Sequence, residues 1–482
     1  MLVRSAAPNG SFLTSEGPNE QRTISREHAG VYYAVVIGAR YKLNESFNVH
    51  LTSTFYDPLY QCIERHPYLS VSVEDMHTDK SYYRQVLEMK LLNHVSIATP
   101  TTAGGDSVEI QKAVEENLVG TWSRGTPPWR IVVLPLEHGC FIAFVFSHAI
   151  GDGRTGVAFH QSLLWAIRNP KNATERQGDL IRVPSTRFPG PFDTPERLPI
   201  SWSFLLSPLI AAIIPDFLSK LLGIRASASP TNSGTWVGSD CPTADELHLV
   251  QSNLIVRKID GPKFEKILCI VKNRNAKFTG VFIQCVFRAL WRNLPSKGNI
   301  TNLVSQVAID MRGSVGIPKD HGGVFAAGCY LISTDREPTA HFHVADWETA
   351  RSYTEKLAVS ATTLQDQMIG LLRYAPSITK WTLSRFGKPR DSSFEVSNVG
   401  VVDDNFAPAD VSSEVKITDM IFAQRGHAMS APLTFNLIHV KGSALTYTVT
   451  WQSGALNVGQ GQEDVFVEKV CDSIEKNLEN LF

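Results

Sequence analysis

The chain has 482 residues, of which 43% are hydrophobic and 19% are charged, so it can bury a large core and is too long for one ordinary domain. Its 46 lysines and arginines balance 47 aspartates and glutamates, which removes the positive field that would favour a nucleic-acid partner or an anionic membrane. We therefore expect two domains, and a small-molecule enzyme fits this composition better than a nucleic-acid-binding protein.

The first 28 residues are polar, contain Gly, Pro and Ser, and lack the apolar core of a secretory signal. We expect a flexible segment over residues 1–28 and a cytoplasmic protein. The cysteines are scattered, most of them within apolar runs, and form no CxxC pair, so neither a disulfide framework nor a zinc knuckle is indicated. They are Cys62, Cys140, Cys241, Cys269, Cys285, Cys329 and Cys471.

The first regular elements are predicted from residue 57 onward. Asp57 can cap a helix whose first position is Pro58, and apolar residues recur at helical spacing up to Arg65. His66-Pro67 ends this helix. Apolar residues then alternate with serines over 69–73, which predicts a half-buried strand.

Two β-rich runs, 131–136 and 140–147, are separated by three residues and predict a hairpin. The second run leads directly to His148. Apolar positions from Phe159 to Ile167 fall on one helical face, and the helix is expected to end near Pro170. His148 is therefore predicted at a strand-to-loop junction just ahead of a helix.

A long crossover, rich in Pro, Ser, Thr and Arg, is predicted over residues 186–245. It contains an apolar segment, 200–224, which prolines and charged residues interrupt, so it is a poor membrane span. Two interpretations remain open: a buried or tunnel-lining helix pair, which we favour, or a surface segment that contacts lipid or an apolar substrate.

The second half repeats the alternation of helices and strands. A helix is predicted from about Thr279, and a closing helix carries apolar residues every fourth position from Phe466 to Leu478. Strands are predicted near 303–310, 435–440 and 444–451. The predicted domains are therefore 29–185 and 246–482, joined by the crossover.

The residues that could carry chemistry begin at His148, which forms an H-x-x-x-D-G pattern with Asp152 and Gly153. Imidazole titrates near neutrality and can take a proton from a hydroxyl without a strongly perturbed pKa. A core histidine bonded to its neighbours is the other interpretation of this short pattern.

Two rival kinds of site, a dinucleotide-binding site and a metal site, could involve the same residues or a separate pair of histidines. Residues 151–156 read G-x-G-x-x-G, but no convincing buried strand follows, so a dinucleotide-binding fold is not favoured. His148 with Asp152, and His341 with His343, have metal-ligand spacing but no third ligand nearby in the sequence, so no metal site is predicted. There is no G-x-S-x-G elbow, which argues against an α/β-hydrolase.

Four motifs in order resemble those of the CoA-dependent acyltransferase superfamily, most closely its alcohol O-acetyltransferase, BAHD-like branch. They are HAIGDG at 148–153, RHPYL at 65–69, IDMR at 309–312 and SNVG at 397–400. The resemblance spans nearly the whole chain. The D-F-G-W-G element of the plant branch is absent, so plant-type substrates are not implied.

The resemblance implies an α/β fold of two chloramphenicol-acetyltransferase-like domains, each a mixed sheet with flanking helices, with a solvent tunnel between them. It implies that His148 is the general base for acyl transfer, without a covalent intermediate. The donor would be acetyl-CoA or another acyl-CoA, used as a co-substrate rather than a bound cofactor. The acceptor would be a small hydroxylated molecule. The apolar segment 200–224 suggests that this molecule is a hydrophobic metabolite, as in secondary metabolism. A monomer is the default expectation.

The resemblance also assigns supporting roles. Asp152 would be structural and pair with Arg312, and Gly151 and Gly153 would keep the loop under the tunnel clear of side chains. Ser397, Asn398 and Gly400 would serve the oxyanion or the donor arm, although an ordinary turn is equally expected. Three basic residues could contact the CoA phosphates or form only a solvated cluster: Lys272, Arg274 and Lys277.

Other functions of the same fold stay open. The acyl group could come from a carrier protein, as in condensation domains, or the chain could shape a substrate without transferring a group. The intact His148 pattern favours transfer.

Overall fold

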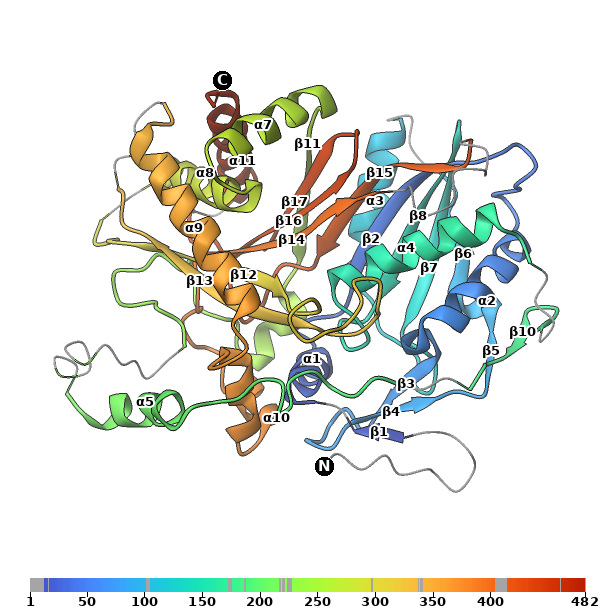
Figure 1. The fold of residues 1–482 in the computed structure, drawn as a ribbon, viewed down its shortest axis with the longest axis horizontal. Helices are drawn as coiled ribbons and strands as arrows, with labels where there is room; N and C mark the ends of the chain where they lie inside the picture. The colour runs from blue at the N-terminus through green and yellow to red at the C-terminus, as the bar shows by residue number, and fades with distance from the viewer. Residues whose placement is uncertain are drawn as a thin grey trace.

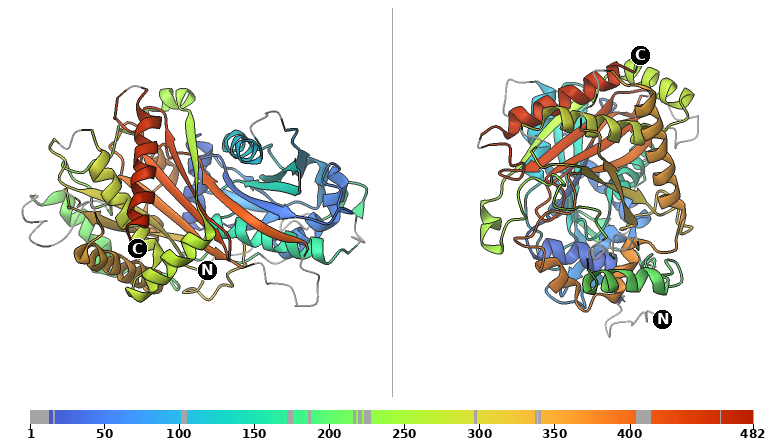
Figure 2. Two further views of the ribbon diagram at one scale, coloured as in Figure 1. Left: turned by 90° about the horizontal axis from the view of Figure 1, so that it is seen from above. Right: turned by 90° about the vertical axis from the view of Figure 1, so that its left-hand side faces the viewer.

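Two helix-covered β-sheets lie side by side in the protein, whose structure is a computed structural model (Figures 1 and 2). The structure describes residues 13–15, 17–100, 105–171, 176–185, 188–215, 218, 222, 228–295, 298–336, 338, 341–403, 414–459 and 461–481. The predicted α/β fold with two sheet-and-helix halves is confirmed.

The first sheet has five strands, and its central strand leads to His148. Every residue of this strand, β8, is buried except the first, as its continuous apolar run predicts for a strand covered on both faces. Helices α2 and α4 cover one face of the sheet and α3 covers the other. In sheet order the strands are β15 (Lys416–Gln424), β2 (Val35–Lys42), β8 (Gly139–Phe146), β7 (Trp129–Leu136) and β6 (Val95–Ile97). The helices are α2 (Tyr56–Arg65), α3 (Asp106–Asn117) and α4 (Gly153–Arg168).

The second sheet has six strands, and α8 packs in the centre of its helical layer between α9 and α11. Twelve of the 16 residues of α8 are buried, because it has neighbours on every side. In sheet order the strands are β11 (Ser252–Ile259), β17 (Leu445–Gln452), β16 (Leu433–Val440), β14 (Phe394–Val402), β12 (Leu303–Asp310) and β13 (Ala326–Ser333). The helices are α7 (Gly261–Asn273), α8 (Phe278–Asn293), α9 (Val344–Thr362) and α11 (Glu463–Glu479).

Strand β15 departs from the predicted division of the chain. It belongs by sequence to the second half, yet it pairs antiparallel with β2 of the first sheet, from Lys416 opposite Lys42 to Gln424 opposite Val35. The predicted domain 246–482 is therefore wrong for this strand. The physical reason is that β2 would otherwise present an unpaired edge, which β15 covers (Figure 2).

The N-terminal segment also differs from the prediction. Residues Pro18–His28 form helix α1, which lies between the two lobes and buries Thr23, Ile24 and Ser25. The Ser25 and Thr382 hydroxyls lie 2.7 Å apart, which ties α1 to α10 (Ile378–Leu383). The polar composition of this segment indicated flexibility, but several of its polar side chains are buried where α1 packs between the two lobes. Residues 1–12 lie outside the described part of the chain.

The crossover carries helix α5 (Trp202–Ile213), which projects from the rest of the molecule (Figure 1). Trp202 is 77% exposed and Ile213 is 84% exposed. The favoured interpretation of a buried or tunnel-lining helix pair is therefore wrong for α5. Most of 216–227 lies outside the described residues. Within the described residues, no helix has the length and apolarity needed to span a membrane.

Most local predictions around the functional motifs are confirmed. The helix from 57 to 65, the hairpin and the helix after residue 152 form as α2, β7–β8 and α4. The predicted strand at 69–73 is partly wrong, because residues up to Ser70 form a 3-10 turn and the strand begins at Val71. The remaining elements are β1 (Leu13–Ser15), β3 (Val71–Glu74), β4 (Tyr82–Gln85), β5 (Glu88–Lys90), β9 (Arg176–Gln177), β10 (Leu180–Arg182), η1 (Thr52–Phe55), η2 (Pro67–Ser70), η3 (Leu91–His94), η4 (Ala244–Leu249) and η5 (Met368–Tyr374).

Gly156 allows α4 to pack closely on the first sheet, and it provides a test of this packing. A Cβ atom at position 156 would lie 2.3 Å from Cγ1 of Ile37 and 3.2 Å from Cε1 of Phe146. We expect Gly156→Ala to lower the free energy of unfolding by about 1–3 kcal/mol through overpacking, against a gain of about 1 kcal/mol in helix propensity. Chemical denaturation measures the change. Gly190→Ala, where the added atom meets nothing within 4 Å, should change stability by less than about 0.5 kcal/mol; equal effects at both positions would contradict this packing.

Candidate active site

The chain places His148 where the first sheet meets the second domain. Strand β8 ends at Phe146, and α4 begins after Asp152, so His148 lies in the short connection between them. The ring of Tyr32 packs edge-on against the His148 ring, with centroids 5.2 Å apart. The strand, the turn and the helix cap together set the direction of the His148 side chain.

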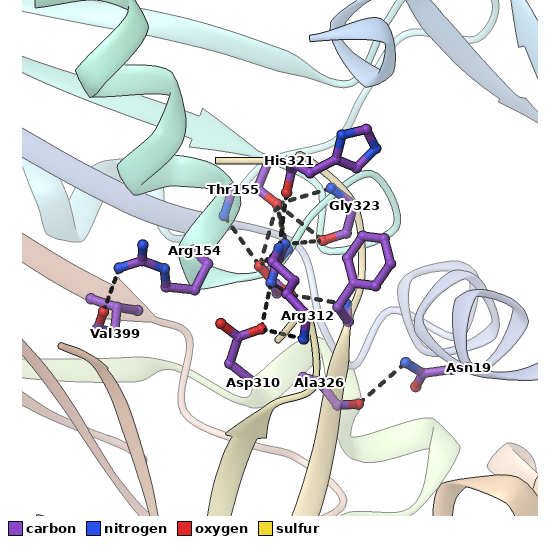
Figure 3. A network of polar contacts seen from close by, with 11 residues as sticks. Asn19, Arg154, Thr155, Asp310, Arg312, His321, Gly323, Ala326 and Val399 are labelled. Atoms are coloured by element: carbon purple, nitrogen blue, oxygen red, sulfur yellow. Dashed lines mark hydrogen bonds and ion pairs between the residues drawn. The ribbon is translucent and has the colours of Figure 1, made fainter. Parts of the chain in front are cut away.

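Asp152 is held by Arg312 across the two domains. Nη1 of Arg312 donates to Oδ2 of Asp152 and Nη2 donates to Oδ1, both at 2.8 Å, so the ion pair is bidentate. Figure 3 shows Arg312 at the centre of the surrounding polar network, with Thr155, Asp310 and Gly323 around it. The Arg312 side chain is fully buried. Burial alone would raise the pKa of Asp152, but the charge and hydrogen bonds of Arg312 hold it below its ordinary value.

Further hydrogen bonds satisfy the rest of this pair. The backbone N–H of Phe325 donates to Oδ2 of Asp152 at 2.9 Å, and the N–H of Thr155 donates to Oδ1 at 3.1 Å as a helix cap. Nε of Arg312 donates to the His321 carbonyl at 2.9 Å. Such saturation is what a buried ion pair needs to offset the cost of leaving water. Asp152 therefore has no free oxygen for proton transfer, in keeping with the structural role that the family resemblance implies.

The glycines beside His148 are required for a different reason from the one expected. A Cβ atom on Gly153 would lie 2.5 Å from Cγ1 of Val399 on β14 and 3.1 Å from Cζ of Phe422 on β15. A Cβ atom on Gly151 would lie 2.6 Å from Cγ2 of Thr155. These contacts correct the idea that the glycines keep an open tunnel clear: protein side chains already occupy the space.

A cavity of about 200 Å³ contains His148, and we call it the His148 cavity. Helix α1 forms one wall with Arg22, Thr23 and Arg26, which the sequence analysis did not single out. The lining also includes Glu395 of β14 and His427. Other residues that line the cavity are Tyr32, Ala326, Met368, Ile369, Leu372, Trp381 and Asp391.

Polar contacts connect the residues around this cavity. The hydroxyl of Tyr32 donates to Oε1 of Gln424, and Nε2 of His427 lies 3.2 Å from Oε2 of Glu395. Burial acts to raise the pKa of Glu395, but His427 and the arginines of α1 hold it below its ordinary value. No spacing in the sequence signals this cluster, because its members come from α1, the segment before β2, β14, the end of β15 and the segment after β15.

Burial lowers the pKa of His148 to about 4. The positive charges of Arg22 and Arg26 act in the same direction, while Asp152 and the backbone carbonyl of His148 act against it. Nδ1 of His148 is buried and has no partner of normal hydrogen-bond geometry among the described residues. At neutral pH the ring is therefore uncharged and able to accept a proton.

The SNVG motif at 397–400 lies on β14, and its Ser397 and Asn398 do not line the His148 cavity. Nδ2 of Asn398 donates to the Thr279 hydroxyl at 3.0 Å, and the N–H of Gly400 donates to Oδ1 of Asn398 at 2.8 Å. Gly400 has φ +83° with open space around it, so the glycine is required by its backbone conformation rather than by a close contact.

The expected phosphate contacts are exposed residues at the turn between α7 and α8. Lys272, Arg274 and Lys277 all lie on the surface there, and the guanidinium of Arg274 lies 5.6 Å from the ring centroid of Trp347. None of the three lines the His148 cavity.

The rival sites find no support in the geometry. Strand β8 runs antiparallel to β2 and β7, and the next strands after α4 belong to another sheet, whereas a dinucleotide-binding unit needs successive parallel strands. The backbone N–H of His343 donates to Asp346 at the start of α9. No group of three or more potential metal ligands occurs within the described ranges.

Comparisons with known proteins define the class. The TRI3 trichothecene 15-O-acetyltransferase of Fusarium sporotrichioides superposes with a TM-score of 0.68, over 100% of this chain and 98% of that one, at 12% identity. The condensation domain of the monacolin K polyketide synthase MokA superposes with a TM-score of 0.59, over 97% and 98% of the two chains, at 10% identity. The fold is therefore the two-lobed fold of condensation domains and chloramphenicol acetyltransferase.

Sequence comparison assigns the family. A sequence model of the alcohol acetyltransferase family matches residues 103–478, so the chain belongs to that family and is an acyltransferase. A probable alcohol acetyltransferase of Aspergillus fumigatus, crmB, is 22% identical to this chain, and the match covers 96% of this chain and 99% of crmB. An uncharacterized protein of Schizosaccharomyces pombe is 23% identical over 90% and 91% of the two chains.

The ion pair beneath the site predicts a large effect on stability. We expect Arg312→Met to lower the free energy of unfolding by about 3–5 kcal/mol, because it leaves the buried Asp152 carboxylate without its charge partner. Chemical denaturation followed by tryptophan fluorescence measures the difference. The matched control is Arg65→Gln, which breaks the exposed 2.8 Å pair with Asp320 and should cost less than about 1 kcal/mol. A loss as small for Arg312→Met as for the control would show that the pair is not structural.

Proposed function

We propose that this chain is an O-acetyltransferase that moves the acetyl group of acetyl-CoA to a hydroxyl of a small molecule, with His148 as the general base. The observation that carries the proposal is an uncharged histidine in the wall of a cavity, in a chain of the alcohol acetyltransferase family. Nδ1 of His148 is buried, which leaves Nε2 as the ring nitrogen that a substrate can reach.

The proposed reaction needs no covalent intermediate. Nε2 of His148 takes the proton from the acceptor hydroxyl as its oxygen attacks the thioester carbonyl. The tetrahedral intermediate then breaks its C–S bond, and the protonated imidazole returns the proton to the departing thiolate of CoA. The ester and free CoA are the products, so no proton is gained or lost by the enzyme. Enclosing both substrates beside one base supplies further acceleration through orientation.

The acceptor is a small hydroxylated molecule. The earlier expectation of a hydrophobic acceptor rested on the apolar segment after residue 200, and α5 of that segment is exposed at the surface. The His148 cavity instead has charged and apolar walls.

His148→Ala should lower kcat/KM about a hundredfold to ten-thousandfold, because it removes the general base. The measurement is free-thiol release from acetyl-CoA with a panel of hydroxylated small molecules. His138→Ala is the matched control, since His138 is exposed in the turn between β7 and β8 and should keep full activity.

The possible outcomes separate the alternatives. Equal release by wild type and His148→Ala would show that this histidine is not the base. Release only from a carrier-protein-bound acetyl thioester, and not from acetyl-CoA, would replace the donor in the proposal.

The lowered pKa of His148 also predicts the pH dependence. A group with a pKa near 4 is uncharged throughout the neutral range, so kcat/KM should vary less than about twofold between about pH 5.5 and 7. The prediction is limited to pH values below about 7 because burial raises the pKa of Glu20 and of Glu27 to about 8, so these two groups begin to lose protons above that pH. Steady-state assays at each pH, with intrinsic fluorescence to verify folding, provide the profile. An acid limb centred near pH 6.5 would contradict a buried base.

A further inference from the structure

Two arginines of α1 face the His148 cavity. Arg22 and Arg26 are four residues apart, which places them on one face of the helix, and both line the cavity. Burial lowers the pKa of Arg22 to about 9, and the charge of Arg26 acts in the same direction. Arg22 still carries its charge at neutral pH.

The guanidinium groups have hydrogen-bond donors that the protein does not use. Nη2 of Arg22 donates to Oδ1 of Asn19 at 3.1 Å, but its Nε is buried with no partner among the residues described. The side chain of Arg26 makes no hydrogen bond or ion pair within the described part of the chain. A guanidinium has five N–H donors, and leaving buried donors without acceptors costs free energy.

The carboxylates of the cavity have partners of their own. Glu395 lies 3.2 Å from His427, and Asp391 accepts hydrogen bonds from the hydroxyls of Ser430 at 2.9 Å and Ser392 at 3.2 Å. They attract Arg22 electrostatically and raise its pKa, but neither accepts a hydrogen bond from it in the structure. The cavity is therefore lined by two cations that form no ion pair among the described residues, and Nε of Arg22 is a buried donor without a protein acceptor.

We propose that the acceptor is a hydroxylated carboxylate, whose carboxylate binds Arg22 and Arg26 while its hydroxyl reaches His148. This inference rests on the proposed function. Guanidinium and carboxylate groups match in shape and form strong, bidentate hydrogen bonds. The apolar body of the acceptor would lie against the side chains of η5 and α10 that line the same cavity: Met368, Ile369, Leu372 and Trp381.

The position of the arginines excludes the phosphates of CoA as their anion. Arg22 and Arg26 line the same cavity as His148, so their charges lie near the base, and both act to lower its pKa. The pantetheine arm separates the phosphates from the thioester that must react beside His148. An anion bound at these arginines therefore belongs to a group next to the reacting atoms.

Binding of a carboxylate and its neutral isostere tests the site without chemistry. Calorimetric titration should show that hexanoate binds the wild-type protein more tightly than hexanamide does. Arg26→Gln should weaken hexanoate binding about tenfold or more and leave acetyl-CoA binding unchanged, while Arg26→Lys keeps the charge and should lose less. Arg182→Gln, an exposed residue on β10, is the control and should bind like wild type. Thermal melting verifies that each variant is folded.

Several results would overturn the inference. One is equal binding of hexanoate and hexanamide. Another is that Arg26→Gln weakens the binding of acetyl-CoA as much as that of hexanoate. A third is faster reaction of neutral alcohols with succinyl-CoA than with acetyl-CoA, which would assign the arginines to the acyl group. Equal thiol release with hexanol and 6-hydroxyhexanoate would overturn the inference and leave the proposed function intact. Absence of release with any acceptor would overturn the proposed function, whereas charge-selective hexanoate binding would still establish the anion site.

Discussion

The bidentate ion pair between Asp152 and Arg312 is the contact on which the site depends. Asp152 caps α4 of the first lobe, and Arg312 follows β12 of the second, so the pair connects the element after His148 to the opposite domain. Isolated in a protein interior, either charge would be costly. Together with the backbone groups of residues 321–325, the two charges are saturated, and the loop that carries His148 is held against the second lobe.

Two other elements, β15 and α1, also connect the two lobes, but through other interactions than an ion pair. β15 leaves the second half of the chain and completes the first sheet through backbone hydrogen bonds, which hide the edge of β2. α1 fills the space between the lobes and contributes side chains to the cavity. The two halves are therefore not independent domains joined by a linker, and a cavity wall can include residues from both ends of the chain.

The sequence predicted the parts of this arrangement that depend on local pattern. The β7–β8 hairpin, the position of His148 after β8 and the start of α4 follow from apolar runs and turn residues within about 40 positions. Arg312 was found as the partner of Asp152 only through the family resemblance, since nothing in the sequence joins residues 160 positions apart. Periodicity could not reveal that α1 is packed, because its buried face carries Asn19, Glu20 and Thr23 rather than a stripe of apolar residues. The opposite error occurred at α5, where an apolar run suggested burial but the helix is exposed.

The electrostatics of the cavity link the two proposals. Burial and the charges of α1 keep His148 uncharged, which makes the base available but also weak, because a pKa near 4 gives little driving force for proton uptake. A carboxylate bound to Arg22 and Arg26 would cancel the positive field of α1 at the imidazole and so raise the pKa of His148. The correct acceptor would then strengthen the base that deprotonates it, and a neutral alcohol of the same size would not. Recognition of the acceptor and activation of its hydroxyl would depend on the same two arginines.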